Sequence, residues 1–276
     1  MTAYHRPRDL DEALALRAAH PDWMVLAGGT DLMVNANHRA APAGMIDLWR
    51  LGDVGFVRVS DIAIAIGAGT TWHEVEAHPA IRARLAPLAA AAREIGALQI
   101  QARATLGGNV GTSSPVGDSL PVLLALDAEL EVASVRGRRR VPYHAWCTGY
   151  RTTQLAADEL IVAAHVPVPG ANQRTTWRKI GTRRAQSISK VMGAAAITLD
   201  GDVVTEARVA LGAVAERPIR VAAVEAAVRG LRLGEAGEAA RLALRTAIRP
   251  IDDVRSTASY RLEVAENLVA RFFAVS

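Results

Sequence analysis

The spacing of hydrophobic and polar residues in the first part of the chain predicts a mixture of helices and strands. Residues 9–20 place Leu10, Ala13 and Leu14 at helical spacing, with acidic residues in the first turn, where the helix dipole favours them. Short apolar runs bounded by polar or glycine positions predict strands. These strands are expected at residues 23–27, 45–51, 61–70 and 158–169.

Two longer segments have mixed patterns. Residues 71–97 are predicted to be helical in two pieces, broken at Pro87. Residues 119–142 are predicted to begin as a short helix and to end as a hairpin about positions 136–138.

The character of the sequence changes at residues 169–174, "PGANQR". Beyond this point strands are predicted at 175–183 and 193–214, the latter with a turn at Asp200-Gly201, because Asp-Gly between apolar runs favours a hairpin. Helices are predicted at 221–246 and 255–274. We therefore expect an α+β chain with a mixed domain at about 1–168, followed by an antiparallel sheet with helices at about 173–276.

Composition disfavours two classes of partner. The 276 residues carry a net charge of +4, but basic and acidic residues are mixed, and the densest basic runs, at 138–140 and 183–184, are short. Aromatic residues make up 4%, too few for the stacking by which proteins bind single-stranded nucleic acid. No apolar run approaches the roughly 20 residues of a membrane span, and the charged start lacks signal-peptide features. We expect a cytoplasmic protein that binds neither nucleic acid nor membrane.

The cysteine content excludes disulfide bonds and cysteine-ligated metal sites within this chain. Cys147 is the single cysteine, so the chain forms no internal disulfide and no cysteine-ligated iron–sulfur cluster or zinc site of its own. We interpret Cys147 as a small buried hydrophobic residue.

The first candidate site is "VLAGGTD", residues 25–31, where a strand runs into a Gly-Gly turn. Free backbone N–H groups at such a turn suit an anion such as a pyrophosphate, although an ordinary tight turn is an open alternative. The motif is neither G-x-G-x-x-G nor a phosphate loop. Since a carboxylate repels phosphate, we expect Asp31 to cap the following helix or to hold a backbone N–H of the loop.

The second candidate site is "ATLGGNVGTSSPVGD", residues 104–118, whose glycine-rich part is predicted to be neither helix nor alternating strand. Gly107 and Gly108 allow close approach to a ligand, and Thr105 and Asn109 offer polar side chains. Asp118 stands before an apolar helix and is either a ligand contact or an N-cap. Two such loops fit a long ligand with a phosphate group.

Four segments in this order, "AGGTDL", "ATLGGNVGTSSPVGDSLP", "GYRTTQLAADELI" and "KIGTRRAQSISKV", resemble the flavoprotein (medium) subunits of molybdenum hydroxylases, the relatives of xanthine dehydrogenase and aerobic carbon monoxide dehydrogenase. The resemblance covers essentially the whole chain. It implies a two-lobed FAD-binding domain of the vanillyl-alcohol-oxidase/PCMH type, with lobes at about 1–57 and 58–168. The C-terminal domain would be of the carbon monoxide dehydrogenase flavoprotein type.

The resemblance also implies cofactor contacts. One loop would wrap the pyrophosphate, with N–H groups from Gly28, Gly29 and Thr30. Lys179 matches a basic position near the flavin, where its charge would stabilise reduced flavin, and a surface lysine is the alternative. The implied contacts are Val25, Leu26, Ala27, Gly28, Gly29, Thr30, Asp31, Leu32, Ile95, Thr105, Leu106, Gly107, Gly108, Asn109, Asp118, Ile161 and Lys179.

The implied function is that of an electron-transfer subunit, without catalytic acid, base or metal ligand of its own. A large partner would carry the molybdenum cofactor and a small partner two [2Fe–2S] clusters, as a dimer of heterotrimers, and FAD would pass electrons to an external acceptor. Two alternatives stay open. One is a self-contained FAD oxidase, for which the C-terminal part is small and rich in predicted helix. The other is a binding module without enzymatic activity. The substrate and the acceptor are not specified by the sequence.

Overall fold

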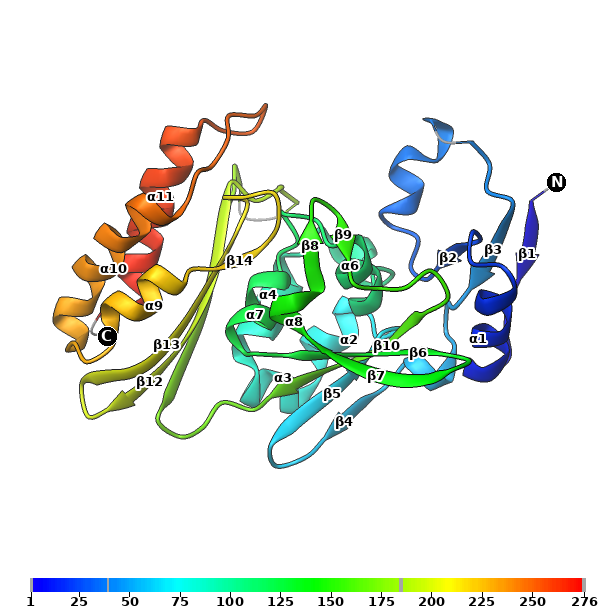
Figure 1. Ribbon diagram of the computed structural model, residues 1–276, viewed down its shortest axis with the longest axis horizontal. Coiled ribbons are helices and arrows are strands. Elements are labelled where there is room, and N and C mark those ends of the chain that lie inside the picture. Colours follow the sequence, from blue (N-terminus) through cyan, green and yellow to red (C-terminus); the bar gives the residue numbers. More distant parts are fainter. Residues whose placement is uncertain (1, 39, 184–185, 275–276) are drawn as a thin grey trace.

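The computed structural model describes residues 2–38, 40–183 and 186–274, so Arg184 of the basic pair at 183–184 lies outside the described residues. The N-terminal segment forms a parallel three-stranded sheet in the order β1-β3-β2 (Figure 1). Helix α1 begins at the cap residue Asp9, whose carboxylate accepts the N–H of Glu12 at 2.8 Å. The elements here are β1 (Ala3–His5), α1 (Leu10–Ala19), β2 (Met24–Leu26), the 3-10 helix η1 (Leu32–His38), β3 (Gly44–Asp47) and the 3-10 helix η2 (Gly52–Val54).

The middle of the chain forms a five-stranded antiparallel sheet in the order β4-β5-β10-β6-β7. Strand β10 lies at its centre and is almost entirely buried, as its continuous apolar sequence predicts. A separate two-stranded hairpin, β8 and β9, precedes β10. The strands are β4 (Val57–Val59), β5 (Ala63–Gly67), β6 (Glu129–Ser134), β7 (Gly137–Pro142), β8 (Cys147–Gly149), β9 (Thr152–Thr153) and β10 (Leu160–Pro167).

The helices at residues 71–97 differ from the sequence prediction. The expectation of two helical pieces broken at Pro87 is wrong, because residues 71–97 contain three helices. Pro79 begins α3 and Pro87 lies in the first turn of α4, since proline lacks the N–H needed to continue the preceding helix. The helices are α2 (Trp72–Ala77), α3 (Pro79–Arg84), α4 (Ala86–Glu94), α5 (Leu98–Gln101), α6 (Leu106–Thr112), α7 (Leu120–Ala125) and α8 (Tyr143–Trp146).

The C-terminal part is an antiparallel sheet, in the order β11-β12-β13-β14, with helices α9–α11 over its outer face (Figure 1). Side chains alternate along β12, so Ala194 and Ala196 join the core of the middle segment, whereas Ala195 and Ile197 pack beneath the C-terminal helices. Helices α4 and α7 contact the inner face of this sheet. The elements are β11 (Gln173–Ile180), β12 (Val191–Asp200), β13 (Val203–Gly212), β14 (Ile219–Arg220), α9 (Ala222–Val228), α10 (Leu233–Ala247) and α11 (Ala258–Phe272).

Two features of the C-terminal part test the sequence prediction directly. The turn at Asp200-Gly201 is confirmed, with Gly201 at φ +61° between β12 and β13. The single helix expected at 221–246 is wrong: Gly230 adopts φ +82° between α9 and α10, and that left-handed conformation breaks the helix. Within the described residues, no helix combines the length and the apolar character that crossing a bilayer demands.

The N-terminal and middle segments meet at Gly28, directly after β2. A Cβ atom on Gly28 would lie 1.8 Å from the carbonyl oxygen of Arg103, so only glycine permits the backbones to approach this closely. The guanidinium of Arg103 lies 3.8 Å from the ring centroid of Trp49 and adds a cation–π contact across the same junction. This contact fixes the position of the Gly-Gly loop relative to the middle segment.

Replacing Gly28 by alanine should therefore destabilise the protein. We expect Gly28→Ala to lower the free energy of unfolding by about 1–3 kcal/mol, the range typical of overpacking. The matched control is Gly52→Ala, since a Cβ at Gly52 meets nothing within 4 Å. Thermal unfolding of both variants measures the difference, and equal midpoints would contradict the assigned role of Gly28.

Candidate cofactor-binding cleft

A cavity of about 1210 Å³ lies between the N-terminal segment, the middle segment and the C-terminal part. Four of the predicted contacts, Leu26, Leu106, Asp118 and Lys179, do not line it. The other thirteen do, so the fold brings most of the two glycine-rich loops to one cavity. They are Val25, Ala27, Gly28, Gly29, Thr30, Asp31, Leu32, Ile95, Thr105, Gly107, Gly108, Asn109 and Ile161.

The Gly-Gly loop offers hydrogen-bond donors to this cavity. Strand β2 ends at Leu26, and Gly29 adopts φ +76°, a conformation that glycine takes without strain. Among the described residues, none accepts a hydrogen bond from the backbone N–H groups of Gly28, Gly29, Thr30 or Asp31. Successive unpaired N–H groups along a cavity wall are the usual means by which backbone binds a phosphate.

The second glycine-rich loop differs from the prediction, because Leu106–Thr112 forms the helix α6. The Thr105 hydroxyl caps it by accepting the N–H of Gly108 at 3.1 Å, and this cap allows a glycine-rich segment to be helical. The N–H groups of Leu106 and Gly107 donate to Thr70 and Ala68 carbonyls at 3.0 and 2.7 Å. The first turn of α6 therefore has no free donors for an anion, and it meets a ligand by close approach.

The adjacent glycines of α6 serve different purposes. A Cβ on Gly107 would lie 2.6 Å from the Cβ of Ala68, so Gly107 allows α6 to pack against the segment after β5. A Cβ on Gly108 would meet only the Thr105 hydroxyl within 4 Å, at 3.1 Å, and Gly108 lines the cavity. Only Gly108 thus has the geometry of a glycine that leaves room for a ligand.

Asp118 and Lys179 form a buried ion pair between the middle segment and β11. The Lys179 ammonium donates to Asp118 Oδ2 at 2.6 Å and to the Glu94 carbonyl at 3.2 Å, and the Ser189 hydroxyl donates to Asp118 Oδ1 at 2.6 Å. Burial raises the pKa of the Asp118 carboxyl, and Lys179 and Ser189 oppose that shift. Asp118 does not cap α7 with its side chain, since Ser119 occupies the N-cap position. It lines a smaller cavity of about 350 Å³ that shares Ile100, Val116 and Ile188 with the large one.

Asp31 has a partner that the sequence did not indicate. Its carboxylate accepts a hydrogen bond from Arg151 Nη2 at 3.4 Å, and not from the N–H of a helix or of its own loop. Arg151 and Tyr150 form the two-residue turn of the β8–β9 hairpin, and both line the cavity. Asp31 and Arg151 are 120 positions apart in the chain, so no local pattern reveals the pair.

The C-terminal part supplies one wall of the cavity through residues 213–216 and through the segment before α11. Arg261 of α11 is buried and donates to the carbonyls of Lys190 and Ala213 at 2.7 and 2.8 Å and to Asp253 Oδ1 at 2.6 Å. Burial raises the pKa of Asp253, but the backbone N–H of Arg255 and the Arg261 guanidinium outweigh it and lower the pKa from 3.8 to about 2. Sequence reasoning missed this wall because none of its residues belongs to a glycine motif.

Comparisons with known proteins agree with this architecture. Residues 1–169 match the FAD binding domain in molybdopterin dehydrogenase, and residues 177–275 match the CO dehydrogenase flavoprotein C-terminal domain. The chain is 30% identical to the nicotinate dehydrogenase FAD-subunit of Eubacterium barkeri, over 98% of this chain and 94% of that subunit. It is 31% identical to the xanthine dehydrogenase FAD-binding subunit of Escherichia coli O157:H7, over 98% and 94% of the two chains.

A solved structure extends the comparison to three dimensions. A chain of the carbon monoxide dehydrogenase of Hydrogenophaga pseudoflava superposes with a TM-score of 0.93 at 30% identity, covering 98% of this chain and 95% of that one. The fold and the cleft thus define a flavin-binding subunit. The chain belongs to the family of FAD-binding subunits of molybdopterin dehydrogenases. The expected α+β fold, family and cofactor are confirmed.

The residues of the cleft fit FAD. The cavity of about 1210 Å³ exceeds the roughly 300–1,000 Å³ of typical small-molecule pockets, so it has room for a large ligand such as a dinucleotide. Unpaired N–H groups at Gly28, Gly29 and Thr30 suit the pyrophosphate, and Ile95 and Ile161 give the apolar contact that a ring system needs. FAD contact at Asp118 and Lys179 stays a prediction, since neither lines the large cavity.

The two glycines of α6 should respond differently to substitution. We expect Gly108→Val to abolish FAD retention and to leave folding intact, because its side chain would enter the cavity. Gly107→Ala should lower the thermal midpoint, because its Cβ would collide with Ala68. Flavin content per chain and thermal unfolding of the FAD-free protein measure both effects. Full FAD occupancy in Gly108→Val would refute the assignment.

The ion pair between Arg261 and Asp253 should make the free energy of unfolding depend on pH in the acid range. Because the folded pKa of Asp253 is depressed, its pairing stabilises the protein above pH 3.8, and that contribution is lost as the pH falls through about 2. We expect Arg261→Met to be less stable than wild type, with a difference in the free energy of unfolding that narrows from about pH 5 towards about pH 2. Arg255→Met, which removes a more exposed partner of Asp253, is the control. A gap that stays constant across the range would contradict the proposed pairing.

Proposed function

We propose that this chain is the FAD-carrying electron-transfer subunit of a heterotrimeric molybdenum hydroxylase. It would pass electrons from [2Fe–2S] clusters of a partner subunit to an external acceptor. The observation that carries the proposal is the cleft, in which an anion-binding loop and an apolar wall face one cavity in a chain of this family. The chain's relatives are FAD subunits and medium chains of multi-subunit dehydrogenases.

The chain's own residues bind and orient the cofactor. Bound FAD supplies the conversion of single-electron arrivals into two-electron delivery. The backbone N–H groups of Gly28, Gly29 and Thr30 would hold the pyrophosphate, and Gly108 would leave room beside α6. Ile95 and Ile161 would exclude water from one part of the cavity. Among the described residues that line the cavity there is no histidine or cysteine, so we expect FAD to be held without a covalent bond.

The contribution of Lys179 to the flavin is limited by its ion pair. The Lys179 ammonium lies against the Asp118 carboxylate and has 4% of its side chain exposed, so the pair presents little net charge to its surroundings. Within the proposed function, Lys179 and Asp118 act as one buried, hydrogen-bonded unit. This unit would hold β11 and the residues before α7 in register beside the cofactor.

The partners follow from the same proposal. A large subunit would carry the molybdenum cofactor and a small subunit two [2Fe–2S] clusters, assembled as a dimer of heterotrimers in the cytoplasm. A nucleic-acid partner does not fit, because the arginines of the densest described basic run are engaged by carboxylates. The pairs are Arg138 with Glu131, Arg139 with Glu159 and Arg140 with Glu129.

We also propose the domain division at about residues 169–172, between β10 and β11. An FAD-binding domain would then span 1–168, with lobes at about 1–57 and 58–168, and a C-terminal domain 173–276. The three larger of the four sheets, one in each proposed lobe and one in the C-terminal domain, support this division. The inner face of the third sheet nevertheless shares the core of the middle segment, so the domains pack tightly.

The chain expressed alone should bind FAD but lack hydroxylase activity. In the proposed function the substrate is oxidised at the molybdenum of the large subunit, which the isolated chain lacks. We expect no reduction of a dye acceptor with purines, other heterocycles or aldehydes, and full activity only with both partner subunits. Robust substrate-dependent dye reduction by the isolated, metal-free chain would favour the self-contained oxidase instead.

A further inference from the structure

The turn of the β8–β9 hairpin places a cation beside the anion-binding loop. Arg151 lies at this turn and pairs with Asp31, which follows the unpaired N–H groups of Gly28, Gly29 and Thr30. Both side chains line the large cavity, with 39% of Arg151 and 45% of Asp31 exposed. A guanidinium, a carboxylate and free backbone donors therefore lie close together.

The Arg151–Asp31 pair leaves most of its hydrogen-bonding capacity unused. Arg151 has five side-chain N–H donors, and the structure assigns it one contact with the described residues, at 3.4 Å. Charge-assisted hydrogen bonds between such groups normally measure about 2.7–2.9 Å. The pair is thus long and single, and it leaves other N–H groups of Arg151 without a partner among the described residues.

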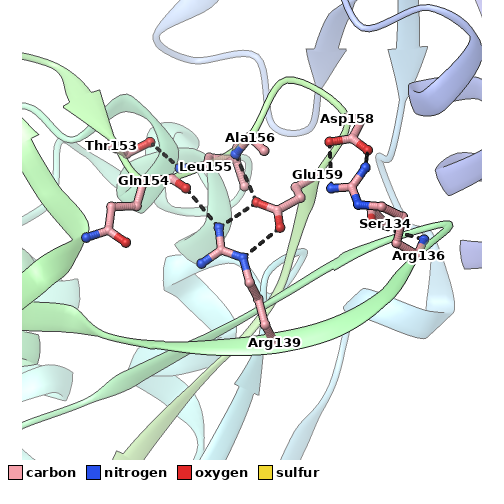
Figure 2. A network of polar contacts seen from close by, with 9 residues as sticks. All are labelled: Ser134, Arg136, Arg139, Thr153, Gln154, Leu155, Ala156, Asp158 and Glu159. Atoms are coloured by element: carbon pink, nitrogen blue, oxygen red, sulfur yellow. Dashed lines mark hydrogen bonds and ion pairs between the residues drawn. The ribbon is translucent and has the colours of Figure 1, made fainter.

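An arginine on the neighbouring five-stranded sheet is engaged much more fully. Figure 2 shows Arg139 bound through two nitrogens to the buried Glu159 and also to the carbonyl of Gln154, just after β9. Glu159 in turn accepts the N–H of Ala156 at 2.9 Å. The base of the β8–β9 hairpin is therefore fixed, so the position of Arg151 at its tip is defined as well.

The backbone conformation of Arg151 also favours a binding role for its side chain. Arg151 adopts φ +52°, a left-handed conformation in which glycine or asparagine is more stable than a long side chain. Residues held in such conformations cluster at binding sites, where the side chain is needed in that place. A binding role for the guanidinium would account for an arginine at this position.

We propose that Arg151 is a further cofactor-binding residue, whose guanidinium binds the pyrophosphate of FAD while Asp31 holds it beside the loop. This inference rests on the proposed function, since it assumes that the cleft binds FAD. It accounts for a carboxylate beside a phosphate site: the positive charge of Arg151 offsets that of Asp31, and its free N–H groups remain available to phosphate oxygens.

The test compares ligands that share different parts of FAD. The assembled complex is stripped of FAD, and binding of FAD, of ADP, which keeps the pyrophosphate, and of riboflavin, which lacks phosphate, is titrated. In Arg151→Asn, whose new residue suits the left-handed turn, we expect the Kd of FAD and of ADP to rise about 10- to 100-fold, as for loss of a charged hydrogen bond. Riboflavin binding should change less than about twofold, and Arg151→Lys should recover part of the loss.

The matched control is Arg136→Asn, because Arg136 also lies at a hairpin turn and pairs with an aspartate, Asp158, but does not line the cavity. It should bind all three ligands as wild type does. Equal losses of ADP and riboflavin in Arg151→Asn, or no loss of either, would overturn the assignment. If the wild-type complex itself failed to bind FAD, the proposed function would fail, and the two outcomes are thus distinguishable.

Discussion

The close approach of Gly28 to the Arg103 carbonyl is the constraint on which the cleft depends. It allows the backbones of two segments that are 75 positions apart to touch, and the loop after β2 then lines the same cavity as α6. The glycines at the start of each motif hold protein against protein, since Gly28 and Gly107 face backbone or side chains of neighbouring segments. The side of Gly108 where a Cβ would lie meets only the Thr105 hydroxyl, and the backbone N–H groups of Gly28 and Gly29 have no partner among the described residues, so these groups are left for the ligand.

That division explains which parts of the site the sequence could predict. The Gly-Gly turn and the glycines of 106–118 stand out locally, and they do line the cavity. The helical state of 106–112 could not be predicted from glycine content, because it depends on the Thr105 cap and on tertiary packing against Ala68. Local propensity is a weak guide where such contacts decide the outcome.

The sequence also could not predict contacts between residues that lie far apart in the chain. The flavin contact of Lys179 stays a prediction, and the sequence did not reveal that its ammonium lies 2.6 Å from Asp118, 61 positions away, outside the large cavity. Asp31 was expected to serve its own loop, and its partner is Arg151. In each case the ion-pair partner depends on how segments far apart in the sequence are placed, which no local pattern reveals. The C-terminal strands were easier, because their alternation and the Asp-Gly turn are local signals.

The arginines of β7 have a consequence for the behaviour of the whole molecule. Strand β7 ends the five-stranded sheet, so one of its sides has no neighbouring strand in that sheet. An open strand edge can recruit another chain and start aggregation, and charged side chains along the edge oppose this. Arg138, Arg139 and Arg140 place three large solvated groups along β7, and their carboxylate partners hold them in place. At this one of the sheet's two edges, the charged side chains thereby oppose pairing with a second molecule.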